Sequence, residues 1–269
     1  MIGTNALSGT DGSGSAEAAT PCPSRTPSLR HLPTMLSAIA GAVEVIAYLS
    51  LGSLFTAHVT GNLVVIATLL ASGHTPNLAQ VLAVPVFVVA LAVVWLIAVA
   101  SGRHGHGLIR PLLTVQFVLL CAVLLLSVAF DVRADRTEVA ATIAAVFAVA
   151  AMATQFALLR LAIPGAPSTA VMTGNLTSAT LSMVDMVTRG RALMSADPER
   201  LRTTGALLVG FIVGGVAGAG ATVELGGWSW VLAVALAGTA LAVPWHGTVT
   251  RHLGQAGEPA QGGPGSAVV

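Results

Sequence analysis

Two short polar motifs stand in apolar sequence, and their residue types can cap helices or hold a polar solute. They read TAHVTGNL at residues 56–63 and TAVMTGNL at 169–176. The repeated triplets are Thr60, Gly61 and Asn62 in the first motif and Thr173, Gly174 and Asn175 in the second. Thr can cap a helix, Gly lets the backbone bend, and the Asn amide both donates and accepts hydrogen bonds.

These properties support two interpretations of the paired motifs. In the first, each triplet starts a half-helix, and the two starts face each other near the membrane midplane around a small solute or ion. In the second, Thr caps, Gly packs, and Asn bonds neighbouring helices with about 0.6–2 kcal/mol. A broken helix at membrane depth must lie against protein or a water-filled cavity in either interpretation.

Glu44 lies near the middle of an apolar run. A charge at the bilayer centre costs about 2.5–3.5 kcal/mol on insertion scales, so its side chain is expected to face the interior. There it would carry a proton, bind a cation, or pair with another polar group. Arg160 is the candidate charge partner, although its place near the end of a run also suits snorkelling to the interface. Gln155, deeper in that run, is expected to bond another helix. Together with Glu44 and the two triplets it forms the candidate solute path.

The composition indicates that these residues sit in a polytopic membrane protein. The chain is 55% hydrophobic and 9% charged, whereas a soluble domain is about 25% charged. It contains no Lys, and most Arg residues fall between the apolar runs. Nothing in it resembles a nucleic-acid-binding surface. The expected surroundings are the lipid bilayer, as an all-α transmembrane helix bundle.

Six runs are long enough to cross the bilayer, which takes about 20 apolar residues. They are residues 35–55, 80–101, 109–130, 138–163, 203–223 and 226–245. The segments that carry the Thr-Gly-Asn motifs, 56–72 and 169–187, are shorter or more polar. The sequence therefore predicts six full spans plus two short segments, with eight crossings as the alternative. Residues 1–34 and 246–269 are polar and are expected to be disordered tails.

The transmembrane domain, residues 35–245, is predicted to consist of two homologous halves, 35–130 and 138–245. A shift of 113 positions places Asn62 on Asn175 and aligns small residues before it. Three crossings per half would invert the second half relative to the first, and four would leave them parallel. The distribution of Arg places both termini in the cytoplasm in either case.

The segment GFIVGGVAGAG carries a ridge of small residues with a period of four, formed by Gly210, Gly214 and Gly218. Such a ridge lets two helices approach closely. Its expected use is helix packing, either within the chain or between copies in a homo-oligomer.

The run AGAVEVIAYLSLGSLFTAHVTGNLVVIATLLASG, with QFALLRLAIPGAPSTAVMTGNLTSATLSM later, resembles the YoaK-like family. These are bacterial multi-pass membrane proteins of unknown function. The resemblance covers roughly residues 35–245 and implies a helical protein of the bacterial inner membrane. It implies no activity.

The motifs of familiar enzymes are absent from the sequence, which has no nucleophile elbow, phosphate loop or zinc-protease helix. We therefore predict no enzyme, no catalytic residues, no cofactor and no metal site. The predicted function is a transporter or channel-like protein for an unidentified small solute or ion. The alternative is a non-transporting membrane module that packs with a partner protein or lipid.

Overall fold

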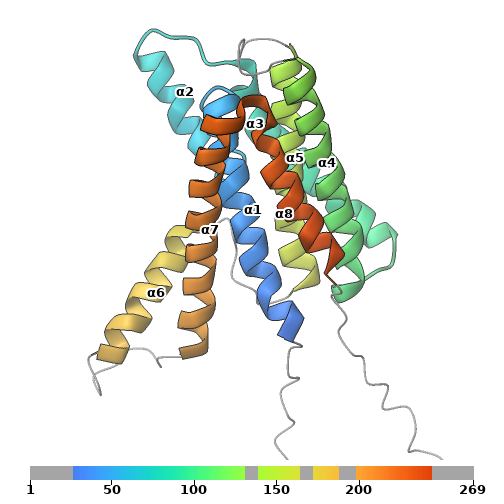
Figure 1. Ribbon diagram of the computed structural model, residues 1–269, viewed down its shortest axis with the longest axis vertical. Helices are drawn as coiled ribbons and strands as arrows, with labels where there is room; N and C mark the ends of the chain where they lie inside the picture. The colour runs from blue at the N-terminus through green and yellow to red at the C-terminus, as the bar shows by residue number, and fades with distance from the viewer. Residues whose placement is uncertain (1–26, 131–138, 164–171, 188–197, 244–269) are drawn as a thin grey trace, which may run out of the picture.

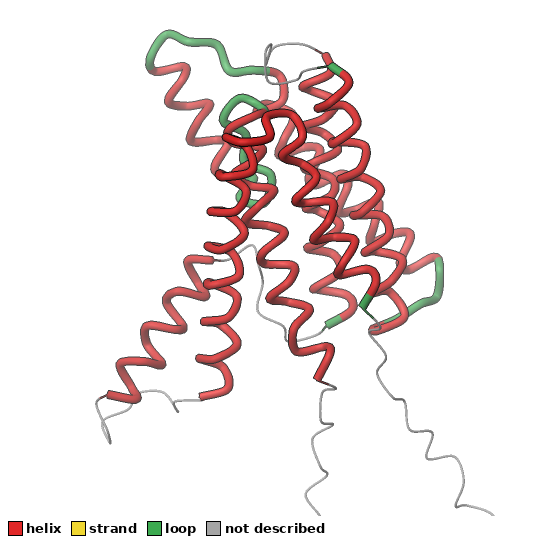
Figure 2. Tube along the Cα trace, in the orientation of Figure 1, coloured by secondary structure: helices red, strands yellow, loops and turns green. Residues whose placement is uncertain are grey.

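A computed structural model describes residues 27–130, 139–163, 172–187 and 198–243, and within these ranges the chain is helical with short connections and no strand (Figures 1 and 2). The helices are α1 (Pro27–Ser50), α2 (Gly61–Ala71), α3 (Leu78–Ala100), η1 (Gly105–Leu108), α4 (Ile109–Ala129), α5 (Val139–Ala162), α6 (Met172–Val187), α7 (Pro198–Leu225), η2 (Gly226–Ser229) and α8 (Trp230–Ala242). The predicted all-α class is confirmed.

Five stretches of helix are long and apolar enough to cross a membrane, among the residues described. Four of them are α1, α3, the η1–α4 segment and α5, and the fifth, Leu201–Ala242, covers both α7 and α8. The chain reverses direction at η2 within this fifth stretch, so α7 and α8 are two separate helices that diverge from this turn (Figure 1). The prediction of a multi-pass helical membrane protein is therefore supported.

The first helix begins earlier than the predicted span at residue 35, because α1 starts at Pro27. Proline suits the first turn of a helix, where its missing N–H would have no partner. The apolar run marks only the part of a helix that suits lipid, whereas helical hydrogen bonding continues into polar sequence. Most of the predicted tails, residues 1–26 and 246–269, lies outside the described residues.

Helices α1 and α5 form the centre of the bundle. In the most apolar stretch of each helix, 67% of the residues of α1 and 72% of those of α5 are buried, against 17% in α3. Helix α1 packs mainly against α7 and also against α8, while α5 packs against α3 and α4. The outer helices therefore present apolar side chains outwards, as a protein in lipid requires.

The glycine ridge packs α7 against α1 within one chain. A Cβ added at Gly210 or Gly218 would lie 2.9 Å from a main-chain carbonyl oxygen of α1. One added at Gly214 would overlap the carbonyl group of Ala38. Gly41 on α1 makes the reciprocal approach to the backbone of α7. The two backbones are therefore in direct contact, which only glycine permits at these positions.

The two short helices occupy corresponding places beside different long helices. Helix α2 packs against α3, and α6 packs against α7. Figure 1 shows α2 extending to the upper end of the bundle and α6 to the lower end, so that their N-terminal ends are the ends nearer the middle. Each Thr-Gly-Asn motif lies at the N-terminal end of its short helix.

Candidate functional site

The site begins where α1 ends and the chain turns back to α2. Gly52 has φ +79°, a left-handed conformation that glycine adopts without strain, and Ser53 follows with φ +58°. Leu51 and Leu54 are buried and anchor the turn in the core. Residues 51–60 thus form an irregular loop packed inside the protein, and we call them the α1–α2 loop.

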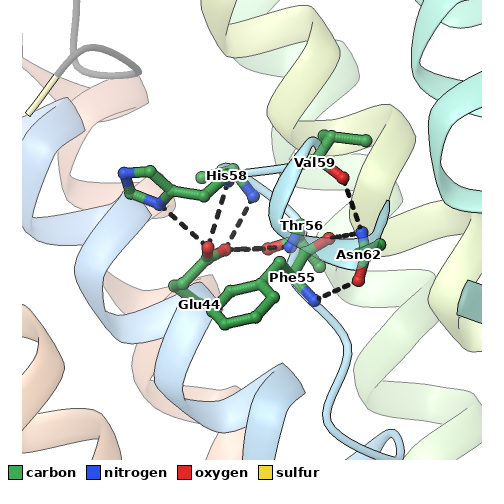
Figure 3. A network of polar contacts seen from close by, with 7 residues as sticks. Glu44, Phe55, Thr56, His58, Val59 and Asn62 are labelled. Carbon is green, nitrogen blue, oxygen red and sulfur yellow. Dashed lines mark hydrogen bonds and ion pairs between the residues drawn. The ribbon is translucent and has the colours of Figure 1, made fainter. Parts of the chain in front are cut away.

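Glu44 of α1 binds this loop through both carboxylate oxygens (Figure 3). Oε2 accepts hydrogen bonds from Thr56 N at 2.9 Å, Thr56 Oγ1 at 2.9 Å and Ala57 N at 2.7 Å. Oε1 lies 3.0 Å from His58 N, which donates to it, and 2.9 Å from His58 Nδ1. Five polar atoms of three consecutive residues therefore converge on one buried carboxylate.

This arrangement solves two problems of polar groups inside a membrane protein. An irregular loop leaves main-chain N–H groups without helical partners, and lipid supplies none. A buried carboxylate is tolerated only when it is paired and hydrogen-bonded. It offers about four lone-pair positions, and five donors fill them. In this arrangement Glu44 therefore has no free position for a cation.

His58 connects the carboxylate to α7 and to the outside of the site. Its ring forms an ion pair with Glu44 and packs edge-on against Phe211 at a centroid distance of 5.7 Å. Its side chain is 35% exposed, whereas Glu44 is buried. His58 lies between the apolar spans, and its hydrogen bond to Glu44 raises its pKa although partial burial opposes this. The carboxylate therefore stabilises the protonated imidazole relative to the neutral one.

Asn62 fixes the other side of the loop. Its Oδ1 accepts from Phe55 N at 2.9 Å, and its Nδ2 donates to Phe55 O at 2.8 Å and to Val59 O at 3.1 Å. The side chain is fully buried. Gly61 lies directly against the Phe55 ring, where a Cβ would be 3.0 Å from a ring carbon. The amide and the glycine together hold residues 55–59 in one conformation.

Thr60 does not have the capping role that its type suggests. It occupies the N-cap position of α2, but its side chain makes no capping hydrogen bond, and it is exposed. Its backbone is already helical at φ −66° and ψ −20°, whereas a capping residue usually has extended backbone. The start of α2 is stabilised instead by the turn bonds of residues 58–63.

The start of the loop is held from α3. The carbonyl oxygen of Gly52 accepts from Asn77 Nδ2 at 3.2 Å and from Gln80 Nε2 at 2.9 Å. Asn77 and Gln80 also form a capping box that begins α3. Two side chains thus tie one carbonyl of the loop to a rigid helix start.

Gln155 is buried away from this loop and joins three helices. Its Oε1 accepts from Gln116 Nε2 of α4 at 2.7 Å, and its Nε2 donates to Leu36 O of α1 at 2.9 Å. The expected bond to another helix is therefore present. This amide pair fixes α4, α5 and α1 together at a position separate from Glu44.

The candidate pairing of Glu44 with Arg160 is not present in the structure, and the alternative of snorkelling fits the position of Arg160. The ion-pair partner of Glu44 is His58, and Arg160 is exposed near the end of α5. A guanidinium near a helix end can reach polar surroundings without the cost of burial, so snorkelling accounts for this position.

The second motif is placed only in part. Gly174 is half-buried in α6, while the side chains of Thr173 and Asn175 lie outside the described part of the structure. Helix α6 packs on α7 and α2 on α3, so the two short helices rest on different long helices.

Sequence reasoning assigned no role to His58, Gln80, Gln116 or Gly41. A signal for His58 exists, because it is a polar residue that follows a membrane carboxylate by 14 positions, with only one short connection between them. Gln80 and Gln116 are also isolated polar residues in apolar runs, which indicates a buried partner. Their actual partners are distant in sequence, so they could not be paired without the fold.

Comparison with known proteins places the chain in a family. No curated protein and no solved structure matches it significantly. One family model matches residues 32–243, which include α1 to α8 almost entirely. This match agrees with the resemblance to YoaK-like proteins. The chain therefore belongs to the family described as protein of unknown function DUF1275.

Proposed function

We propose that this protein is a transporter of a small solute, built from two inverted halves, α1–α4 and α5–α8. The observation that carries the proposal is the matching pattern of helix contacts in the two halves. Helix α1 packs on α7 of the other half, just as α5 packs on α3. Helix α1 also packs on α8, as α5 does on α4, and α2 packs on α3, as α6 does on α7.

Exchanging the two halves therefore leaves this set of contacts unchanged, as a pseudo-two-fold axis requires. The short helices α2 and α6 extend to opposite ends of the bundle (Figure 1), which supports an axis in the membrane plane. Inverted repeats with discontinuous helices near the midplane are typical of secondary transporters.

The short length of α2 supports six crossings rather than eight. Helix α2 has 11 residues, about 16 Å at 1.5 Å per residue, and is shorter than α8, whose 13 residues continue directly from η2. The hydrocarbon core is about 30 Å thick. Figure 2 shows the α2–α3 connection and the α3–α4 connection at opposite ends of the bundle, as expected when α3 crosses. With both termini in the cytoplasm, Arg103 and Arg110 then lie inside.

The alternative function is a non-transporting membrane module. It is favoured by the full set of hydrogen bonds around Glu44 and Asn62, which are buried and satisfied within the protein. A transporter must open this region to each side of the membrane in turn, whereas a module that only packs with a partner would keep it closed.

Single-cysteine labelling tests both the topology and the exchange between states. In a variant without native cysteines, His74→Cys should react with an impermeant maleimide only from outside, and His106→Cys only from inside. Both positions are exposed, His74 in the α2–α3 connection and His106 in η1. With both termini in the cytoplasm, the reverse pattern would indicate eight crossings and would overturn the inverted-repeat proposal.

His58→Cys then distinguishes a transporter from a static module. In a transporter this position should react from the outside in right-side-out vesicles and from the inside in inverted vesicles, because the site alternates. His74→Cys is the matched control, since it should react from one side only. Reaction of His58→Cys from one side only, under all solute conditions tested, would favour the module.

A further inference from the structure

We infer that residues 56–58 form a carboxylate-binding site, that Glu44 occupies it in this structure, and that the transported solute is a small carboxylate. This inference rests on the proposed transport function. It assigns the class of solute and the residues that would hold it.

The donors of the site come from the loop alone. The main-chain N–H groups of Thr56, Ala57 and His58 point to one place, together with the Thr56 hydroxyl and the His58 ring. Successive main-chain N–H groups that converge in this way form a concave anion-binding site. The anion they hold here is a carboxylate, supplied by α1.

The geometry suits two oxygens rather than a single-atom anion. Three donors serve Oε2 and two serve Oε1, at distances between 2.7 and 3.0 Å. These are the distances of charge-assisted hydrogen bonds. The donor set is therefore shaped for a planar carboxylate, and a halide would leave part of it without a partner.

The loop has supports that do not involve Glu44. Asn62 binds Phe55 and Val59, on either side of the donors. Asn77 and Gln80 bind Gly52 at the start of the loop. Removing the glutamate would therefore leave a preorganised set of donors, and preorganisation is what makes a binding site effective.

The occupying anion and its donors belong to separate elements. Glu44 is on α1, which is packed against α7, whereas the donors lie in the loop before α2. Helix α2 has no acidic residue in its first turn, so its positive N-terminal end has no other nearby anion of its own. One set of donors cannot hold two carboxylates, so a solute enters only when Glu44 withdraws. The half-exposed His58 forms the accessible edge.

Chemical rescue tests the site without requiring transport. Purified Glu44→Ala in detergent should unfold at a lower temperature than the native protein. Sodium acetate should raise its Tm by several degrees with a saturable dependence on concentration, because ligands that bind only the folded state stabilise it. Acetamide, which has the same shape without the charge, and sodium chloride should not do so. Native protein should show a much smaller acetate-specific shift, because acetate must first displace Glu44 from the donors.

Gln155→Ala is the matched control, because it also removes a buried polar side chain but leaves no carboxylate-shaped vacancy. The inference would be overturned if acetate raised the Tm of Glu44→Ala no more than it raised the Tm of Gln155→Ala. It would also be overturned if acetamide raised the Tm of Glu44→Ala as much as acetate did. If Glu44→Ala cannot be purified, Glu44→Gln takes its place. Its amide group presents N–H to donors, so acetate should displace it and give the same specific shift, and absence of that shift would count against the site.

A transport measurement separates this inference from the proposed function. Native protein in liposomes should take up radiolabelled glycolate, and unlabelled acetate should compete. Specific rescue of Glu44→Ala without carboxylate uptake would keep the binding site and refute the carboxylate as the transported solute. Alternating labelling of His58→Cys without rescue would keep a transporter and refute the carboxylate site.

Discussion

The contact between α1 and α7 gives the sharpest test of how this bundle is held together. Gly214 is buried on α7, and a Cβ there would overlap the carbonyl group of Ala38 on α1. Gly220 lies less than two turns further along the same helix, is exposed, and has nothing within 4 Å of an added Cβ. Gly214→Ala and Gly220→Ala therefore make the same chemical change in two different environments.

The expected energies differ in sign. Replacing glycine by alanine inside a helix stabilises it by roughly 0.5–1 kcal/mol when there is space. Overpacking typically costs about 1–3 kcal/mol, and Gly214 belongs at the upper end because it faces backbone, which cannot rotate away. Gly220→Ala should therefore be slightly stabilising. Gly214→Ala should be about 3 kcal/mol less stable than Gly220→Ala, because the helix propensity term cancels between them.

Thermal unfolding in detergent measures this difference. For a chain of this size 1 kcal/mol corresponds to about 2–4 °C, so the two variants should differ in Tm by about 6–12 °C. The fraction that remains monodisperse after heating gives a second readout. Equal Tm values for Gly214→Ala and Gly220→Ala would refute the close packing of α1 on α7.

Three further outcomes are expected at the α1–α2 loop. Glu44→Gln should lower the free energy of unfolding by about 3–5 kcal/mol, the cost of breaking a buried pair, which denaturant titration measures. It should also abolish uptake into liposomes, because Glu44 must exchange with the solute. A stable, active variant would contradict both expectations. Because folding raises the pKa of His58, the stability that His58 contributes is complete at pH values below its unfolded pKa of about 6.5. That stability is lost as the pH rises through the higher pKa of the folded state. A plot of Tm against pH should show this loss in the native protein and not in His58→Gln. Asn62→Ala should cost about 2–4 kcal/mol by leaving the Phe55 N–H and carbonyl without partners, whereas the exposed Thr60→Ala should change Tm little.

Several features followed from the sequence because they depend on local composition. Apolar runs of about 20 residues gave the long helices, since lipid requires apolar side chains and internal backbone bonding. The period of four at Gly210, Gly214 and Gly218 indicated a close helix contact, because residues at that spacing share one helix face. The polar triplet of residues 60–62 marked the start of a short helix, because it interrupts a run that would otherwise continue.

The sequence did not determine which polar side chains bond to one another. A carboxylate inside a membrane protein requires a polar partner, and on charge alone Arg160 was a suitable partner for Glu44. In the folded protein the partner of Glu44 is His58, because the left-handed turn at Gly52 and Ser53 brings residues 56–58 back onto α1. The roles of Thr60 and Asn62 also depended on backbone geometry, since an Asn that binds Phe55 stabilises a loop rather than bridging helices.

The sequence by itself therefore determined that this protein is a helical membrane bundle with a costly carboxylate and two interrupted segments. These follow from the free energy of transferring side chains and backbone into lipid, which is a local property. Only the tertiary structure decided that Glu44 holds a loop of main-chain donors and that α1 lies against the glycines of α7. Hydrogen bonds and packing join residues far apart in the chain, and their geometry exists only once the helices are in place.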